Sequence, residues 1–308
     1  MIKDEIKFGH ITCEEDLQTY TEEVVKGEPV VIKPNWANSL PTSLSHFQAL
    51  EKLLSCLEGK DLVVAESYSA WRNRLYRQHF LETGNIEWEE NVKPHNAKEM
   101  WEWLKKEDEW FLDFFGFKKR VQENNVEYVN ITDEVWNRRT APPEKVRAFV
   151  GEKQALVKNT AFYEIVPERL MKLKGCILLN FTKLYKTGIY AAKNMMGFIP
   201  DPNGAEYHGV ENSNLIQTIH DINIIYRSLF NVVDVVESIT EQKIILSGDN
   251  PAQLDEVGCV VLGTELADPY HDILKAKDIF GSYPDISLSD IPDFICEGIR
   301  EGVKNKMF

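Results

Sequence analysis

The chain has 308 residues, a formal net charge of −14 and 43% hydrophobic residues, which is enough apolar material for a full core and argues against a disordered chain. The acidic balance argues against nucleic acid and anionic lipid as partners, because both would repel it. No apolar stretch approaches the roughly 18 residues of a membrane span, and the first five residues lack an apolar signal segment, so we expect a cytoplasmic protein.

Cofactor motifs are missing from the sequence. The five cysteines are scattered and include no Cys-x-x-Cys pair, so the chain has no iron–sulfur or zinc signature. It also has no phosphate-binding Gly-rich loop, no dinucleotide fingerprint, no Gly-x-Ser-x-Gly elbow and no His-Glu-x-x-His pair. These absences argue against nucleotide and flavin cofactors, serine hydrolysis and zinc proteolysis. A small-molecule substrate is the expected partner, and the sequence leaves the oligomeric state open.

The first half of the chain alternates strand and helix patterns. Runs of β-branched residues at Pro29–Pro34 and Leu62–Ala65 predict two buried strands. Between them, residues 42–57 carry apolar side chains at helical spacing behind a Thr-Ser cap signal. Residues 70–125 are mostly helical in pattern and rich in aromatic side chains, which we interpret as core or as a lid over a ligand. Val126–Ile131 predicts a third strand.

The second half is more strongly patterned. Apolar runs at Gly175–Phe181, Asn231–Val236 and Gly258–Gly263 each predict a strand. Isoleucines recur at helical spacing in Leu215–Phe230, which predicts a buried helix. A terminal amphipathic helix is expected at Ile291–Val303.

Strands that alternate with helices predict an α/β fold with a largely parallel sheet and helices on both faces. The loop Arg138–Pro143 marks a possible division of the chain. We therefore expect an N-terminal α/β lobe at residues 1–145, with the aromatic helical insertion at about 70–125. A C-terminal α/β lobe would follow at residues 146–308.

Polar side chains follow several of the predicted strands, and ligands of open α/β sheets gather beyond the carboxyl ends of strands. Lys33 and Asn35 follow the first strand, and Glu66 follows the second. Lys186 comes after the strand at residues 175–181, and Asp234 lies within the next strand. We expect the first four to contribute to substrate binding, although polar residues are common in any loop.

One segment, residues 187–208, combines three glycines with more reactive side chains. Lys193 lies between small residues and a Met-Met pair, and a lysine that is partly removed from water has a lowered pKa and can act as a base or nucleophile. His208 is a candidate acid–base partner for Lys193, and Asn194 a candidate substrate ligand. The alternative is that Lys193 reaches solvent from a helix and His208 caps a loop.

Arg72, Arg74 and Arg77 share one face of a predicted helix. They fit a solvated face or ion pairs with acidic neighbours, and the alternative is a seat for a substrate carboxylate or phosphate.

Five motifs occur in order: VVIKPNW at residues 30–36, VVAES at 63–67, AAKNMMG at 191–197 with YH at 207–208, HDINIIYRSLFNVVD at 220–234 and GCVVLGTELADPYHD at 258–272. Together they resemble the domain-of-unknown-function family 362 from about residue 29 to about 281. That family is distantly similar to the amino-terminal part of nickel-pincer lactate racemases, which also place a lysine before a glycine turn and a histidine some fifteen positions later. The resemblance implies that Lys193 and His208 lie where chemistry takes place.

Three functions are compatible with these observations. The first is a small-molecule enzyme of isomerase, lyase or cyclase type that transfers protons, with Lys193 and His208 as catalytic residues. The second is a metal-dependent enzyme related to the lactate-racemase-like proteins, with a divalent metal held by His208 and Asp234. The third is a non-catalytic ligand-binding or accessory protein, in which the aromatic region 88–117 is a contact surface.

Overall fold

The computed structural model describes residues 6–10, 18, 21, 25, 29–37, 39, 41–84, 97–123, 126–184, 190–200, 207, 213–238, 244–263, 277–283, 286–293 and 295. No helix among these residues is both long enough and apolar enough to cross a lipid bilayer.

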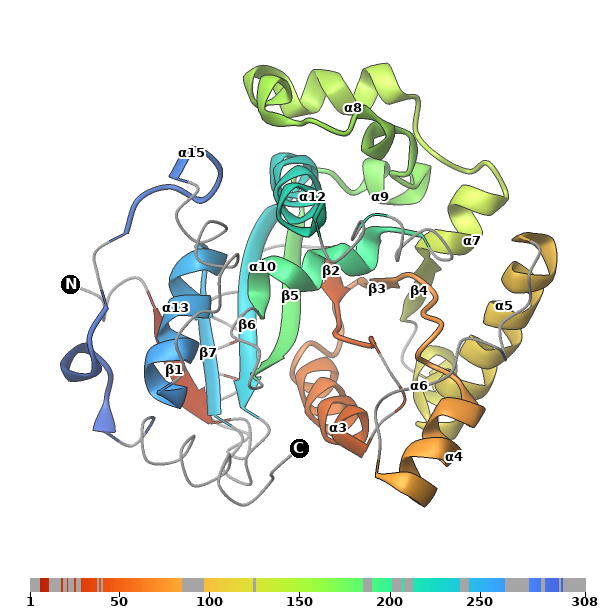
Figure 1. The fold of residues 1–308 in the computed structure, drawn as a ribbon, viewed down its shortest axis with the longest axis horizontal. Coiled ribbons are helices and arrows are strands. Elements are labelled where there is room, and N and C mark those ends of the chain that lie inside the picture. Colours follow the sequence, from red (N-terminus) through yellow and green to blue (C-terminus); the bar gives the residue numbers. More distant parts are fainter. Residues whose placement is uncertain are drawn as a thin grey trace.

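Within this part of the chain, seven strands form one sheet in the order β1-β7-β6-β5-β2-β3-β4 (Figure 1). The neighbouring pairs among β6, β5, β2, β3 and β4 are parallel, whereas β7 runs antiparallel to both β6 and β1. The prediction of an α/β fold with a largely parallel sheet is confirmed. The strand bounds are β1 Lys7–His10, β2 Val30–Lys33, β3 Leu62–Glu66, β4 Glu127–Asn130, β5 Ile177–Leu184, β6 Asn231–Ser238 and β7 Ile244–Gly248.

Helices cover both faces of this sheet, as predicted. One face packs on α3 (Pro41–Cys56), α5 (Ala97–Phe114) and α6 (Phe117–Glu123). The other face packs on α10 (Ala191–Asn194), α12 (Leu215–Leu229) and α13 (Pro251–Leu262), which Figure 1 shows along the same side of the sheet. The remaining helices are α4 Arg74–Thr83, α7 Ile131–Trp136, α8 Pro143–Val150, α9 Glu168–Lys172 and α15 Lys277–Phe280, and the 3-10 helices are η2 Gly151–Leu156, η3 Thr160–Glu164, η4 Met195–Phe198 and η6 Leu288–Asp290.

Side-chain alternation along β5 explains how the two faces differ. Leu178 faces the cluster that contains α12, whereas Leu179 and Phe181 face α3. Every residue of β2 and β3 is buried, which agrees with their β-branched runs and with strands covered on both faces.

One predicted strand is wrong. Residues Gly258–Gly263 form the end of helix α13, not a strand. The Asn250 side chain accepts the Ala252 and Gln253 N–H groups at the helix start, and Pro251 occupies the first turn. A short apolar run fits a buried helix as well as a buried strand, and here the start signals lie upstream of that run.

Two strands were not predicted, β1 and β7. Both pair antiparallel at the same edge, beyond the parallel strands. The predicted terminal helix at Ile291–Val303 lies mostly outside the described residues.

The halves of the chain meet inside the sheet. β2, from the predicted N-terminal lobe, pairs with β5 from the predicted C-terminal lobe through four residues of each strand. The sheet is therefore continuous across the predicted boundary at residue 145, and a division into lobes stays a prediction.

Candidate functional site

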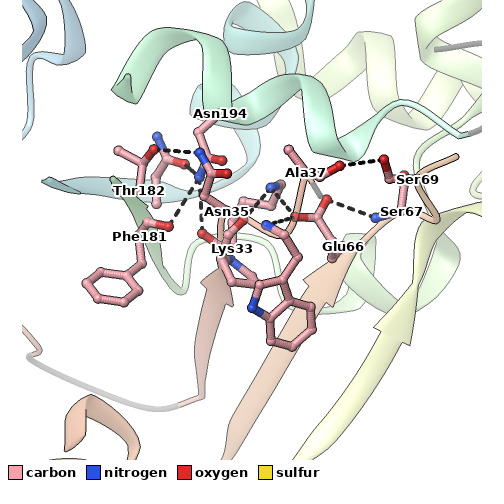
Figure 2. Close-up of polar contacts among 12 residues, drawn as sticks. Lys33, Asn35, Ala37, Glu66, Ser67, Ser69, Phe181, Thr182 and Asn194 are labelled. Carbon is pink, nitrogen blue, oxygen red and sulfur yellow. Dashed lines mark hydrogen bonds and ion pairs between the residues drawn. The ribbon is translucent and has the colours of Figure 1, made fainter. Parts of the chain in front are cut away.

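The carboxyl ends of β2, β3, β5 and β6 carry a cluster of buried polar side chains beneath the segment α10–η4 (Figure 2). These strands are neighbours in the sheet, so side chains that are far apart in the sequence meet at one edge. The edge is the position at which open α/β folds bind their ligands.

Lys33 and Glu66 form a buried ion pair at the centre of this cluster. The Lys33 Nζ donates to Glu66 Oε2 at 2.7 Å and to the Pro34 carbonyl at 2.7 Å, and Lys33 is 1% exposed. The backbone N–H of Ser67 donates to the other carboxylate oxygen at 3.0 Å. Burial lowers the pKa of Lys33, and the Glu66 carboxylate opposes that shift.

Gly197 packs directly on this ion pair. A Cβ at Gly197 would lie 2.2 Å from Glu66 Oε1 and 2.4 Å from Lys33 Nζ, so no larger residue fits without moving them. The Gly197 carbonyl also accepts the Ser67 N–H at 2.9 Å, which ties η4 to the end of β3. The glycine of the Lys-Asn-x-x-Gly motif is therefore explained by close approach.

Asn194 lies beside the pair and joins α10 to the strands below it. Its side-chain amide donates to Asn180 Oδ1 at 2.8 Å and approaches the Lys33 carbonyl at 3.3 Å. Asn35 donates to Thr182 Oγ1 at 3.0 Å, from the loop after β2 to β5 (Figure 2). Lys33, Asn35, Glu66 and Asn194 were predicted to bind substrate, and the structure brings all four to one edge.

Asp234 is buried in β6 and engaged in an ion pair. Arg227 donates to both carboxylate oxygens at 2.7 Å, and Asn180 donates to one of them at 2.6 Å. Burial raises the pKa of Asp234, and Arg227 opposes that shift. Among the described residues, no group of three or more His, Cys, Asp or Glu side chains could hold a metal ion, so these contacts give no support to Asp234 as a metal ligand.

Lys193 projects from α10, next to Asn194. It is partly buried, and burial lowers its pKa. Within the described part of the chain it has no hydrogen bond or ion pair. A larger share of such an amine is uncharged near neutral pH than of a fully solvated lysine, so more of it is available as a base or nucleophile.

Asp255 of α13 fixes the start of α10 and thereby the position of Lys193. Its carboxylate accepts three successive backbone N–H groups, those of Tyr190 at 3.0 Å, Ala191 at 2.7 Å and Ala192 at 3.1 Å. Burial raises the pKa of Asp255 to about 7, although these hydrogen bonds favour the charged form. This residue was not predicted, because nothing around it in the sequence marks a contact with a segment 63 to 65 residues earlier.

His208 and Lys186 lie outside the described residues, so their predicted places in the site stay predictions. Tyr207 is described. Its carbonyl accepts the Thr218 hydroxyl at 2.8 Å, and its ring lies 4.8 Å from that of Phe162.

The opposite face of the same edge holds a second set of polar residues, His46, Lys183 and Glu237. The sequence pattern placed Lys183 and Glu237 among the polar residues that follow strands, whereas His46 was not predicted. His46 of α3 shares a hydrogen bond with Glu237 Oε2 at 3.0 Å through its Nδ1. Lys183 is opposite Glu237 in the pairing of β5 with β6. The predicted strands ended at Phe181 and Val236 and left both charged residues in loops, whereas the real strands run two residues or more further.

The three arginines predicted on one helix face make separate contacts. Arg72 is buried, forms an ion pair with Asp108 and donates to the Ser67 carbonyl at 2.8 Å. Arg74 pairs with Glu107 at 2.7 Å, while Arg77 donates to the Ser39 carbonyl at 2.8 Å. The contacts of Arg72 and Arg74 agree with the predicted ion pairs, whereas Arg77 binds a backbone carbonyl. Comparisons of the chain with protein-family models, with curated proteins and with solved structures found no match.

Proposed function

We propose that the chain is an enzyme that acts on a small molecule by proton transfer at the carboxyl edge of its sheet, in a reaction of isomerase, lyase or cyclase type. The observation that carries the proposal is the environment of Lys193. Its amine is partly removed from water and has no polar partner among the described residues, and it belongs to a helix held by Asn194 and Asp255. A general base requires an amine with a lowered pKa on a backbone that is fixed beside the substrate, and Lys193 has both the lowered pKa and the fixed helix.

The energetic cost of burying charged groups supports a functional role for the carboxyl edge of the sheet. Taking the charges of Lys33 and Glu66 out of water costs several kcal/mol per ion before their attraction offsets it, and apolar residues of similar size would be at least as stable. Costly buried charges concentrate where a protein needs them for chemistry. Because Lys33 is bonded to Glu66, we assign it to positioning the loops of the site and leave substrate contact to Lys193 and Asn194.

The resemblance to family 362 adds His208 to the proposal as the partner acid. In that arrangement Lys193 removes a proton next to a carbonyl or carboxylate, and His208 delivers one to the product. The assignment of His208 rests on the motif alone.

Hydrogen exchange tests this proposal without knowledge of the net reaction. A set of small hydroxy, oxo and amino acids would be incubated with the protein in D2O, and loss of carbon-bound protons would be followed by proton NMR. We expect enzyme-dependent exchange in at least one compound, with loss of at least a hundredfold in Lys193→Met because a general base contributes about 10² to 10⁴ in rate.

The matched control is Lys145→Met, since Lys145 is an exposed lysine on α8. Full exchange by a folded Lys193→Met protein would refute the role of Lys193. Elemental analysis of untagged protein separates the alternative, because a metal-dependent enzyme would carry a near-stoichiometric transition metal.

A further inference from the structure

Lys183 is a buried amine on the face of the sheet opposite to α10. Its side chain follows Leu179 and Phe181 in the alternation of β5, and these two pack in the core beneath α3. The Phe181 ring stacks on His46 at 4.6 Å, so the surroundings are an aromatic ring, an imidazole and aliphatic core. Lys183 is 3% exposed.

The amine has no bonded partner among the described residues. No hydrogen bond and no ion pair within 4.0 Å joins Lys183 to any of them, unlike Lys33, which has Glu66. The nearest opposite charge in the pairing of β5 with β6 is Glu237, the residue across from Lys183, and it acts on the lysine through its charge.

Glu237 is held in place by His46, and the tautomer of that histidine follows from its contacts. The Asn35 backbone N–H donates to His46 Nε2 at 3.0 Å, so Nε2 carries no proton. The remaining proton is then on Nδ1, which donates to Glu237 Oε2 at 3.0 Å. A neutral histidine therefore orients an ionised carboxylate opposite an amine, and burial together with Lys183 and Lys33 lowers the pKa of His46 in agreement with that state.

A structural role accounts poorly for this arrangement. Burying an ammonium group without a bonded partner destabilises the fold, and a methionine or leucine would fill the same space without that cost. Burial lowers the pKa of Lys183 to about 8, while Glu237 opposes the shift. At pH 7 about a tenth of this amine is therefore uncharged and nucleophilic.

We propose that Lys183 forms an imine with a small uncharged aldehyde or ketone, with Glu237 as the proton carrier and His46 as the residue that positions it. The Glu237 carboxylate would repel an anionic carbonyl compound, so the site favours an uncharged one. This site is separate from Lys193 and does not depend on the function proposed above.

The reaction balances without an oxidant or reductant. The Lys183 nitrogen bonds to the carbonyl carbon, and the π electrons of the carbonyl move to its oxygen. Glu237 accepts a proton from the nitrogen and returns it to that oxygen. The hydroxyl group then leaves as water while the nitrogen lone pair forms the C=N bond, and the second nitrogen proton departs with it. One amine and one carbonyl give one imine and one water.

The test is reductive trapping of the full chain with propanal and sodium cyanoborohydride at pH 7, followed by peptide mass spectrometry to locate the propyl group. A lysine of pKa about 8 holds on the order of a hundredfold more neutral amine at this pH than one of ordinary pKa near 10.4. We expect Lys183 to be labelled at least tenfold faster than the exposed Lys145 and Lys172. Labelling of exposed lysines with Lys183 unmodified would overturn the proposal.

Two further measurements distinguish a reactive lysine from a merely structural one. Labelling of Lys183 should rise with pH and level off above about pH 8, a profile set by burial and by Glu237 and His46 facing the amine. Glu237→Gln should slow the labelling at least tenfold, while Lys193→Met should leave it unchanged. If Lys193 is labelled in place of Lys183, the imine proposal fails and the reactive amine of the edge is the one on α10.

Discussion

Gly197 offers a direct measure of how tightly the α10–η4 segment packs on the buried ion pair. An alanine Cβ at this position would lie 2.2 Å from Glu66 Oε1, 2.4 Å from Lys33 Nζ and 2.6 Å from Lys33 Cε. Ordinary contacts begin near 3.4 Å, so both charged groups must move by roughly 1 Å or the segment must lift. Movement of the two charged groups disrupts the 2.7 Å bond between them, whereas lifting the segment breaks the 2.9 Å hydrogen bond from the Ser67 N–H to the Gly197 carbonyl.

The expected size of the effect follows from three contributions. Breaking a buried ion pair costs about 3 to 5 kcal/mol when its partners stay buried. Replacing glycine by alanine in a helical turn returns up to about 1 kcal/mol, and the Gly197 backbone is not in the left-handed region that would oppose alanine. Partial relaxation of the lysine side chain reduces the loss further. We expect Gly197→Ala to lower the free energy of unfolding by about 2 to 4 kcal/mol.

Urea denaturation followed by circular dichroism measures this quantity, provided that the slope with denaturant stays the same. Gly258→Ala is the matched control, because its Cβ would meet apolar atoms of Tyr190 at 2.6 Å and Leu184 at 2.7 Å instead of charges. Overpacking of this kind costs about 1 to 3 kcal/mol, less the same helical gain. A Gly197→Ala protein as stable as the wild type, or more stable than Gly258→Ala, would refute the argument from the ion pair.

Two further predictions concern buried carboxylates. Asp255→Asn should cost about 1 to 3 kcal/mol because one amide oxygen replaces the carboxylate that accepts three N–H groups of residues 190–192. Because burial raises the folded-state pKa of Asp255 from 3.8 to about 7, its proton-linked stability is complete below the unfolded pKa and is lost as the pH rises through the folded pKa. The advantage of wild type over Asp255→Asn in urea titrations should therefore shrink between about pH 4 and pH 7 and change little above that range. Arg72→Met should lower the free energy of unfolding by about 3 to 5 kcal/mol, because it leaves Asp108 buried without its partner. Adding Asp108→Leu to this variant should recover most of that loss. Equal stability of the single and double variants in thermal or urea unfolding would contradict this prediction.

The parts of the fold that were predicted correctly have signals within a single element. β2 and β3 are short apolar runs that contain β-branched residues, and α3 repeats its apolar residues at helical spacing. The wrong strand at residues 258–263 shows the limit of this reasoning. Cys259–Leu262 is apolar enough for either structure, and the deciding groups are Asn250 and Pro251, which lie outside the run.

The candidate site was predicted in location but not in its contacts. The rule that ligands gather at the carboxyl ends of strands selected Lys33, Glu66 and Asn194, and the structure places them together. β2 and β3 are neighbours, so their carboxyl ends lie side by side, but their register pairs Ile32 with Val64 and does not set Lys33 opposite Glu66. The ion pair therefore depends on how the chain continues at the ends of both strands, which neither strand shows by itself. His46 gave no signal, because one polar residue at the start of an amphipathic helix is ordinary.

Lys193 and Lys183 lie in different surroundings at this edge, but Asn35 contacts the surroundings of both. The Asn35 N–H donates to His46 on the α3 face, while its side-chain amide donates to Thr182 on the α10 face. A substitution at Asn35 would therefore disturb the carboxylate opposite Lys183 and the strand beneath α10 together, and its effects would not separate the two sites. Lys193 lies on the α10 face of the sheet and Lys183 lies on the α3 face. The independence of the two chemistries is therefore decided by changing each lysine alone, and a shared loss in both single variants would mean that the edge acts as one site.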